Sequence, residues 1–254
     1  MNLTLLVKAY HGSQLKQIDE LLQSQLGDLD VEVKLLGNPI NKWVQVSVAG
    51  EDEAVAAAYI RKEIGVCPAS LKEVEEGTVL KGYISRVDEG KLTVDVGVFE
   101  PKVVQAVVSL ASLQSQLAGG RDVPIKRIAE LYPLAEGFPV SVTVVSKSSE
   151  ALQAELSAEQ VEKFLSWQRS LLDRLIVLRA SKELIAATLE RTRLDRDVIE
   201  VEPLGLFEFA LTCKLGTDAA GLIPRVGRYM RYAVFVVFNA KRSGAFLGGK
   251  GLSL

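Results

Sequence analysis

The residues best suited to chemistry with a ligand lie in one segment, KLGTDAAGLIPRVGRYMRY, which runs from Lys214 to Tyr232. Asp218 is the single acidic residue among its basic side chains. Residues 214–254 together hold seven basic residues and one acidic residue, a local charge of +6. The whole chain has a formal net charge of −2, so residues 1–213 carry −8. A basic segment on an acidic chain attracts anions through its own local field.

The types and spacing of these residues suit phosphate groups and unpaired bases. Arginine presents a planar fork of donors that matches phosphate geometry, and a glycine-rich turn can expose backbone N–H groups. A tyrosine between arginines can stack on an unpaired base. The candidate contacts are Lys214, Gly216, Thr217, Arg225, Arg228, Tyr229 and Arg231. The alternative is a solvated face, because glycines also mark ordinary turns and AAGLIP is mostly apolar.

A second glycine-rich stretch, GAFLGGK at Gly244 to Lys250, fits part of a phosphate-binding loop. That motif needs a Ser or Thr next and a helix whose N-terminus faces the phosphates. Gly251 follows instead, and the sequence ends at Leu254. We therefore expect no nucleotide binding here, no cofactor, and a mobile tail from Arg242 onward.

Other chemistry is poorly supported by the sequence. His11 is the single histidine, and Cys67 and Cys213 are too far apart in sequence to form a local metal or redox pair. An acidic cluster before a Pro-Leu-Gly turn matches no calcium-loop pattern. Its members are Asp195, Asp197, Glu200 and Glu202. We predict no catalytic residue and no metal ligand.

The elements that must position the basic segment fall into three parts, because 254 residues exceed the usual size of one domain. Residues 1–68 alternate strand and helix signals in the order βαββα, a small α+β module. With six basic and nine acidic residues, this module is a poor candidate for binding phosphate. Residues 148–254 predict helices and strands of a second α+β module, which carries the basic loop and the tail.

Residues 69–147 predict several short strands with turns and one longer excursion, which favours a small barrel. GTVLKGYISRV, KLTVDVGVFEP and EGFPVSVTVV resemble the S1 variety of the OB barrel. That resemblance implies binding of single-stranded nucleic acid by aromatic and basic side chains. The contacts it implies are Tyr83, Arg86 and Phe99. The alternative is a spacer or protein-binding barrel whose aromatic residues lie in its core.

The fold class predicted for the whole chain is therefore α+β multidomain, with a central S1-like OB barrel between two α+β modules. The order of the modules and the block from Arg196 to Arg228, RDVIEVEPLGLFEFALTCKLGTDAAGLIPRVGR, resemble an archaeal family catalogued as domain of unknown function 2110. The resemblance implies an archaeal, cytoplasmic protein and supplies no activity.

The function favoured by these features is non-catalytic binding of RNA, or of a ribonucleoprotein surface, in archaeal information processing. Two alternatives stay open: an adaptor that binds only proteins, and an enzyme with an unrecognised site. The longest apolar stretch, AVFVVF, is far shorter than the roughly twenty residues of a membrane helix. No signal-peptide pattern is present, so we expect a cytoplasmic protein without membrane contact.

Overall fold

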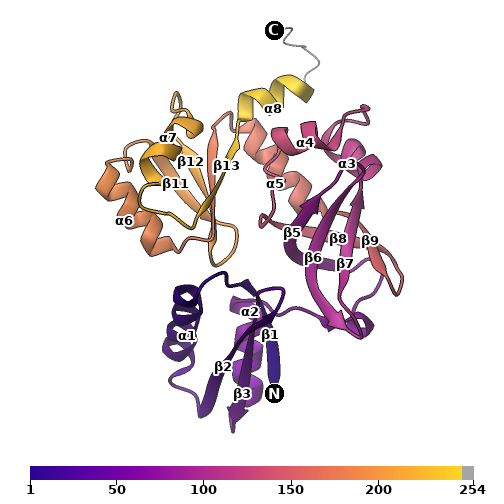
Figure 1. Ribbon diagram of the computed structural model, residues 1–254, viewed down its shortest axis with the longest axis vertical. Helices are drawn as coiled ribbons and strands as arrows, with labels where there is room; N and C mark the ends of the chain where they lie inside the picture. Colours follow the sequence, from indigo (N-terminus) through magenta and orange to yellow (C-terminus); the bar gives the residue numbers. More distant parts are fainter. Residues whose placement is uncertain (248–254) are drawn as a thin grey trace. The chain divides into compact units, whose positions relative to one another are not determined.

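The computed structural model describes residues 1–247, with the side chain of Leu247 excepted (Figure 1). It divides into two compact units. The first holds Met1–Val74 with Val96–Val104, and the second holds Glu75–Asp95 with the chain from Gln105 onward. The predicted α+β architecture is confirmed, with separate N-terminal and C-terminal sheet modules and a closed barrel in the central region.

The N-terminal module has the predicted order βαββα. Its elements are β1 (Asn2–Lys8), α1 (Gly12–Leu26), β2 (Val31–Ile40), β3 (Trp43–Gly50) and α2 (Glu53–Glu63). The strands form an antiparallel sheet in the order β1-β3-β2, with α1 beside β2 and α2 beside β3. Alternate residues of β3, such as Val46 and Val48, are fully buried, as are Ile18 and Leu22 of α1. Period-two strands facing an apolar helix stripe produce this core.

The central module is a closed barrel of five strands, as predicted. They are β5 (Val79–Val87), β6 (Lys91–Glu100), β7 (Val104–Ser109), β8 (Pro139–Lys147) and β9 (Ala151–Leu156). The pairing order is β6-β5-β8-β9-β7, and β7 pairs again with β6, which closes the ring. The pair β7–β9 is parallel, so a crossover is required between them. The sheet therefore continues past residue 147, where the sequence suggested a boundary.

Short elements complete the central module. Before the barrel lie β4 (Ala69–Ser70), which pairs in parallel with β6, and the 3-10 helix η1 (Leu71–Glu73). The excursion between β7 and β8 contains α3 (Leu110–Leu117) and α4 (Ile125–Leu131). A five-stranded Greek-key barrel of this size is the OB architecture.

The C-terminal module is a four-stranded antiparallel sheet with helices. Its elements are α5 (Ala158–Arg169), β10 (Arg174–Leu178), α6 (Lys182–Thr192), β11 (Val198–Pro203), β12 (Glu208–Cys213), α7 (Ala219–Val226), β13 (Val234–Phe238) and α8 (Ala240–Leu247). The strand order is β11-β12-β10-β13. All five residues of β10 are buried, which indicates cover on both faces of this strand.

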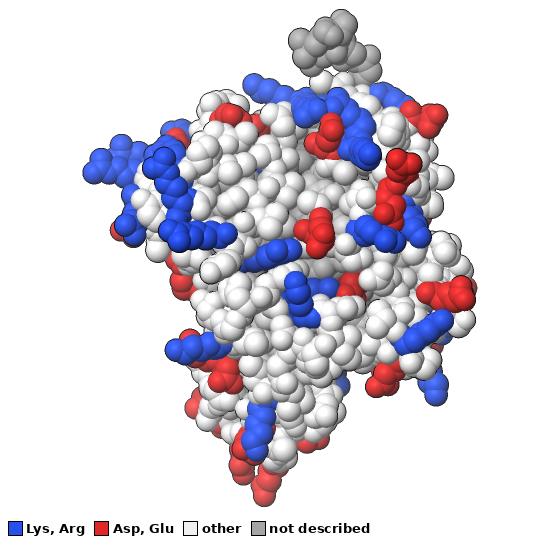
Figure 2. All heavy atoms as spheres, in the orientation of Figure 1, with Lys and Arg blue, Asp and Glu red and all other residues white. Residues whose placement is uncertain are grey.

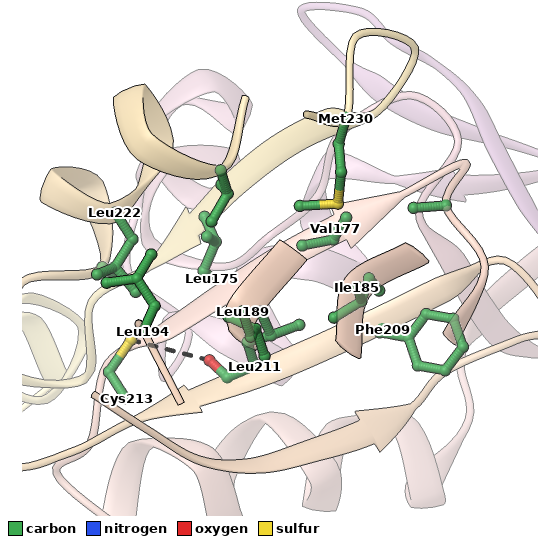
Figure 3. Packing of buried hydrophobic residues seen from close by; sticks show 13 residues of the cluster. Leu175, Val177, Ile185, Leu189, Leu194, Phe209, Leu211, Cys213, Leu222 and Met230 are labelled. Carbon is green, nitrogen blue, oxygen red and sulfur yellow. Dashed lines mark hydrogen bonds between the residues drawn. The ribbon is translucent and has the colours of Figure 1, made fainter. Parts of the chain in front are cut away.

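One face of this sheet supports α6 and α7 (Figure 3). Leu175 of β10 and Leu211 of β12 pack with Ile185 and Leu189 of α6 and with Leu222 of α7. Successive side chains of a strand point to opposite faces, so the odd-numbered residues of β10 and β12 define the face that these helices cover. The two helices are therefore fixed side by side, with their outer faces turned to solvent.

The expected mobile tail does not begin at Arg242. Residues 240–247 form helix α8, in which Ala240 and Ser243 are fully buried. Gly244 to Leu247 of the GAFLGGK stretch belong to this helix, and the rest of that stretch lies outside the described residues. Ser243 is a buried position of α8, so deletion from Ser243 onward is expected to destabilise the fold.

Candidate nucleic-acid interface

The C-terminal end of α6 brings arginines to the edge of α7. Arg193 ends α6 in the left-handed conformation, with φ 57°, and its backbone N–H donates to the carbonyls of Glu190 and Leu189. Such a residue stops the helix and satisfies its last carbonyls. Arg191 lies in the last turn of the helix, and both arginine side chains are exposed.

Arg225 of α7 connects the two helices. Its Nη2 donates to the carbonyl oxygen of Thr192 at 2.6 Å, and its Nη1 lies 4.0 Å from Oδ2 of Asp197. A cation at the C-terminus of a helix is favourable, because it satisfies an unpaired carbonyl and opposes the helix dipole. Arg225 is thus oriented by its contacts, although half of its side chain remains exposed.

An arginine and a tyrosine stack between the same two helices. The guanidinium carbon of Arg191 lies 4.5 Å from the centroid of the Tyr229 ring. Tyr229 follows the end of α7 and is 39% exposed. A cation–π contact of this kind holds the ring in place while leaving part of it open to a ligand.

These residues form a surface that we call the α6–α7 surface. Its members are Arg191, Arg193, Arg196, Arg225, Arg228, Tyr229 and Arg231. Figure 2 shows Lys and Arg side chains gathered on the left of the view, over the region of α6 and α7 in Figure 1. Within the described part of the chain, the guanidinium groups of Arg193, Arg228 and Arg231 have no hydrogen-bond or ion-pair partner. Asp197, which lies near Arg225, reduces the net positive charge of the surface.

The predicted residues at the start of the basic segment lie at the opposite end of α7. Gly216 adopts φ +90° in a turn that Thr217 closes by donating its N–H to the Lys214 carbonyl at 2.9 Å. Asp218 then caps α7, and its carboxylate accepts from the N–H groups of Ala220 and Gly221. That negative charge already occupies the helix N-terminus, so Gly216 and Thr217 are poorly placed to hold an anion there.

Lys214 borders the α6–α7 surface. Its backbone N–H donates to the backbone carbonyl of Asp197 at 2.8 Å. The side-chain carboxylate of Asp197 lies near Arg225. Arg225, Arg228, Tyr229 and Arg231 lie at or just after the C-terminal end of α7, and Lys214 is linked to them only through the backbone of Asp197. The backbone at Gly216 and Thr217 stands apart from the arginines.

The barrel residues predicted to bind nucleic acid are not part of this surface. Tyr83 is 3% exposed, and its hydroxyl donates to Oε2 of Glu208 at 3.3 Å. Arg86 is exposed and pairs with Asp88, with Nε 2.9 Å from Oδ2. Phe99 is partly buried. The ring of Tyr83 is therefore unavailable for stacking on a base, and we leave it out of the proposed interface.

Glu208 is the buried carboxyl group that holds Tyr83. It is 1% exposed, and burial raises its pKa from the usual 4.5 to about 8. The backbone N–H of Phe207, the Tyr83 hydroxyl and the positive charge of Arg179 oppose this rise and do not cancel it. Desolvation dominates, so Glu208 is protonated at neutral pH.

The second strand of the barrel is also used for packing. In the first compact unit, an ideal Cβ at Gly97 of β6 would lie 2.4 Å from Sγ of Cys67 and 3.6 Å from Cε2 of Trp43. Gly97 has φ +74°, a conformation that L side chains rarely adopt. OB barrels bind oligonucleotides on the face of their second and third strands. At Gly97 that strand is covered by the chain's own residues.

Sequence reasoning missed the α6 contribution to the surface. Arg191, Arg193 and Arg196 lie 18 to 23 residues before the basic segment and outside its glycine pattern. The signal that could have located them is the run RTRLDR, Arg191 to Arg196, which begins in the last two residues of the predicted helix KELIAATLERT. A helix that ends in basic residues points to an exposed basic terminus, although its neighbour in space cannot be inferred from that run.

Among the described residues, no group of three His, Cys, Asp or Glu side chains is arranged to hold a metal ion. Cys67 and Cys213 are both buried free thiols, and burial raises the pKa of Cys213 to about 11. No helix in the described part of the chain is long and apolar enough to span a membrane.

The fold and the surface define an α+β protein of three modules, with a five-stranded barrel at its centre and an arginine-rich surface on its C-terminal module. The chain belongs to the DUF2110 family. Models of the DUF2110 N-terminal, central and C-terminal domains match residues 2–70, 74–168 and 172–238. The central model ends at residue 168, so it includes β9 and all of α5 except its last residue, beyond the boundary suggested at residue 147.

Two solved structures are similar to parts of the chain. The a/eIF2alpha-aDim2p-rRNA complex from Pyrococcus horikoshii OT3 matches at 15% identity over 47% of this chain and 64% of that chain, with a TM-score of 0.26. The intact alpha subunit of aIF2 from Pyrococcus abyssi matches at 11% identity over 65% of this chain and 97% of that chain, also with a TM-score of 0.26. At these TM-scores the likenesses carry no argument about function. No curated protein matches in sequence.

Proposed function

We propose that this protein binds RNA through the α6–α7 surface without catalysing a reaction. The observation that supports this proposal is the meeting of two arginine groups, distant in sequence, around one exposed tyrosine. The guanidinium of Arg191 lies 4.5 Å from the Tyr229 ring, and Arg225 reaches the carbonyl of Thr192 at 2.6 Å. Placement in archaeal information processing, or on a ribonucleoprotein surface, stays a prediction.

The chemistry of the surface favours single-stranded RNA. Arginine binds phosphate oxygens with two parallel hydrogen bonds, and Arg193, Arg228 and Arg231 are exposed for that role. Tyr229 is held by Arg191, so its ring offers a fixed plane for an unpaired base. Bases in a duplex are already stacked, so a tyrosine platform is useful mainly on single strands.

The test is a salt titration of binding to a single-stranded RNA of about 12 nucleotides. The variant replaces Arg193, Arg228 and Arg231 by Ala, because these side chains hold no other element in place. If each neutralises one phosphate, log affinity falls against log salt with a slope shallower by about 2 in the variant. Binding should weaken for all RNA sequences alike, because phosphate contacts carry no sequence information.

A matched control removes the same charge elsewhere. Lys16, Lys34 and Lys62 are exposed lysines of the N-terminal module, and each lies in a solvent-exposed ion pair. Their triple replacement by Ala should leave the salt slope unchanged. Equal affinities and slopes for the wild type and the arginine variant would refute RNA binding at this surface, and a protein adaptor would become the better explanation.

A further inference from the structure

A second group of basic side chains lies where α8 meets α4. We call it the α4–α8 surface, and its members are Arg121, Lys126, Arg127, Lys241 and Arg242. It joins residues that are more than one hundred positions apart in sequence. Figure 2 shows Lys and Arg side chains gathered near the top of the view, in the region that α8 occupies in Figure 1.

Helix α8 is firmly attached to the C-terminal sheet. Asp173, directly before β10, accepts from the Ala240 N–H at 3.2 Å and from Nδ2 of Asn239 at 3.0 Å. The side chain of Asn239 caps the helix by accepting from the Arg242 N–H at 2.8 Å. These contacts, with the full burial of Ala240 and Ser243, fix the direction in which Lys241 and Arg242 project.

The helix is also connected to α4 through one shared carboxylate. Oε2 of Glu130 accepts from Arg127 at 3.0 Å and from Arg242 at 3.1 Å. Two guanidinium groups on one carboxylate leave an excess positive charge. Counting Asp122, Glu130 and Asp173, whose charge interacts with that of Lys241, against the five basic residues, the surface carries +2.

Two lysines of this surface are exposed and available. Among the described residues, the ammonium groups of Lys126 and Lys241 have no hydrogen-bond or ion-pair partner. The nearby aromatic ring, Phe246, is covered by the guanidinium of Arg121, whose carbon lies 5.4 Å from the ring centroid. Phe246 is only partly exposed, unlike Tyr229, so this surface offers mainly positive charge, which suits phosphates better than bases.

We infer that the α4–α8 surface binds the phosphodiester backbone of the same RNA that occupies the α6–α7 surface. This inference rests on the proposed function and adds a second contact to it. A ligand that reaches both surfaces binds the second one at a high effective concentration, so affinity increases with RNA length. An RNA too short to reach both surfaces binds each one separately.

The test compares RNAs of about 8 and about 30 nucleotides on the wild type and on a Lys126→Ala/Lys241→Ala variant. Neither lysine takes part in the Glu130 ion pairs, so α8 keeps its connection to α4. The variant should lose roughly tenfold in affinity for the long RNA, and its salt slope should become shallower by about 1.4. The wild type should bind two short RNAs per protein and the variant only one.

A Lys81→Ala/Lys102→Ala variant is the control, because both lysines are exposed on the central region. It should match the wild type with both RNAs. If Lys126→Ala/Lys241→Ala also matches the wild type while the Arg193, Arg228 and Arg231 variant loses binding, the second contact is refuted and the proposed function stands. If none of the variants changes binding of either RNA, both proposals fail.

Discussion

The barrel and the α6–α7 surface make opposite uses of similar residue types. The barrel has strand sequences that resemble those of S1 domains, yet its Tyr83 is 3% exposed and its Gly97 lies against Cys67. The α6–α7 surface matches no such pattern, yet it exposes arginines around Tyr229. The comparison teaches that a barrel can have strand sequences typical of a binding domain while residues of those strands are buried by packing. Function must therefore be read from exposed side chains, and a fold alone does not specify it.

The physical reason is the cost of burial. A tyrosine hydroxyl and a carboxyl group can enter the interior together when they bond to each other, as Tyr83 and Glu208 do. An arginine without a partner cannot do so, because its charge is too costly to desolvate. Tyr83 thus becomes part of the core, whereas Arg193, Arg228 and Arg231 stay in water.

The largest effect should come from Glu208, the group that holds Tyr83 in the core. The folded protein keeps a proton that the unfolded chain releases near pH 4.5, so the free energy of unfolding falls as pH rises from about 4.5 to about 8. Between pH 5 and pH 9, the free energy of unfolding of the wild type should fall by about 4 kcal/mol more than that of Glu208→Gln. Chemical denaturation at a series of pH values measures this difference.

Glu155→Gln is the control for that series, because Glu155 is an exposed carboxylate of β9. Its pH profile should follow that of the wild type. Parallel profiles for the wild type and Glu208→Gln would mean that Glu208 is ionised in the folded protein. In that case Tyr83 would not be held by a neutral carboxyl group.

The next largest effect should come from adding a side-chain atom at Gly97, where β6 packs against Cys67. Gly97→Ala places a Cβ 2.4 Å from Sγ and 2.5 Å from Cβ of Cys67, and it adds the strain of φ +74°. We expect a loss of about 3 kcal/mol in the free energy of unfolding. Gly77→Ala is the control, because Gly77 has φ +82° with nothing within 4 Å of its Cβ, and it should cost about 1 kcal/mol.

Similar losses for the two glycine variants would show that backbone strain alone matters at Gly97. The contact between β6 and Cys67 would then add nothing to the loss in the free energy of unfolding. The denaturation midpoint of each variant measures its stability. Its RNA affinity under native conditions is measured separately and reports on function. Gly97→Ala should leave the salt slope of RNA binding unchanged, because Gly97 lies outside the α6–α7 surface.

The smallest effect should come from the exposed arginine of the barrel. Arg86 is neutralised by Asp88 at 2.9 Å, whereas Arg228 has no partner among the described residues. Arg86→Ala should change RNA affinity by less than about twofold, while Arg228→Ala should weaken it by about threefold and reduce the salt slope by about 0.7. A larger loss of RNA affinity for Arg86→Ala than for Arg228→Ala would indicate that the barrel, and not the α6–α7 surface, contacts the RNA.

The sequence alone predicted the βαββα order of the N-terminal module and a central barrel, but it missed helix α8 and placed β9 outside the barrel. The strand and helix signals of residues 1–68 predicted the order βαββα, the short strands of residues 69–147 predicted a barrel, and the missing Ser or Thr after Lys250 argued against a nucleotide loop. These patterns are local, because strand and helix periods depend on residues only a few positions apart. The arginines of the Lys214 to Tyr232 segment were found in the same way, from their density in a short window.

Tertiary structure alone decided which side chains meet. The stacking of Arg191 on Tyr229, the reach of Arg242 to Glu130 and the burial of Tyr83 against Glu208 each join residues 38 or more positions apart. Such contacts depend on which faces of the modules are covered, and that is decided by packing over the whole domain. A local sequence pattern can therefore predict a helix or a strand, but only the packed structure decides whether its charged or aromatic residues reach solvent.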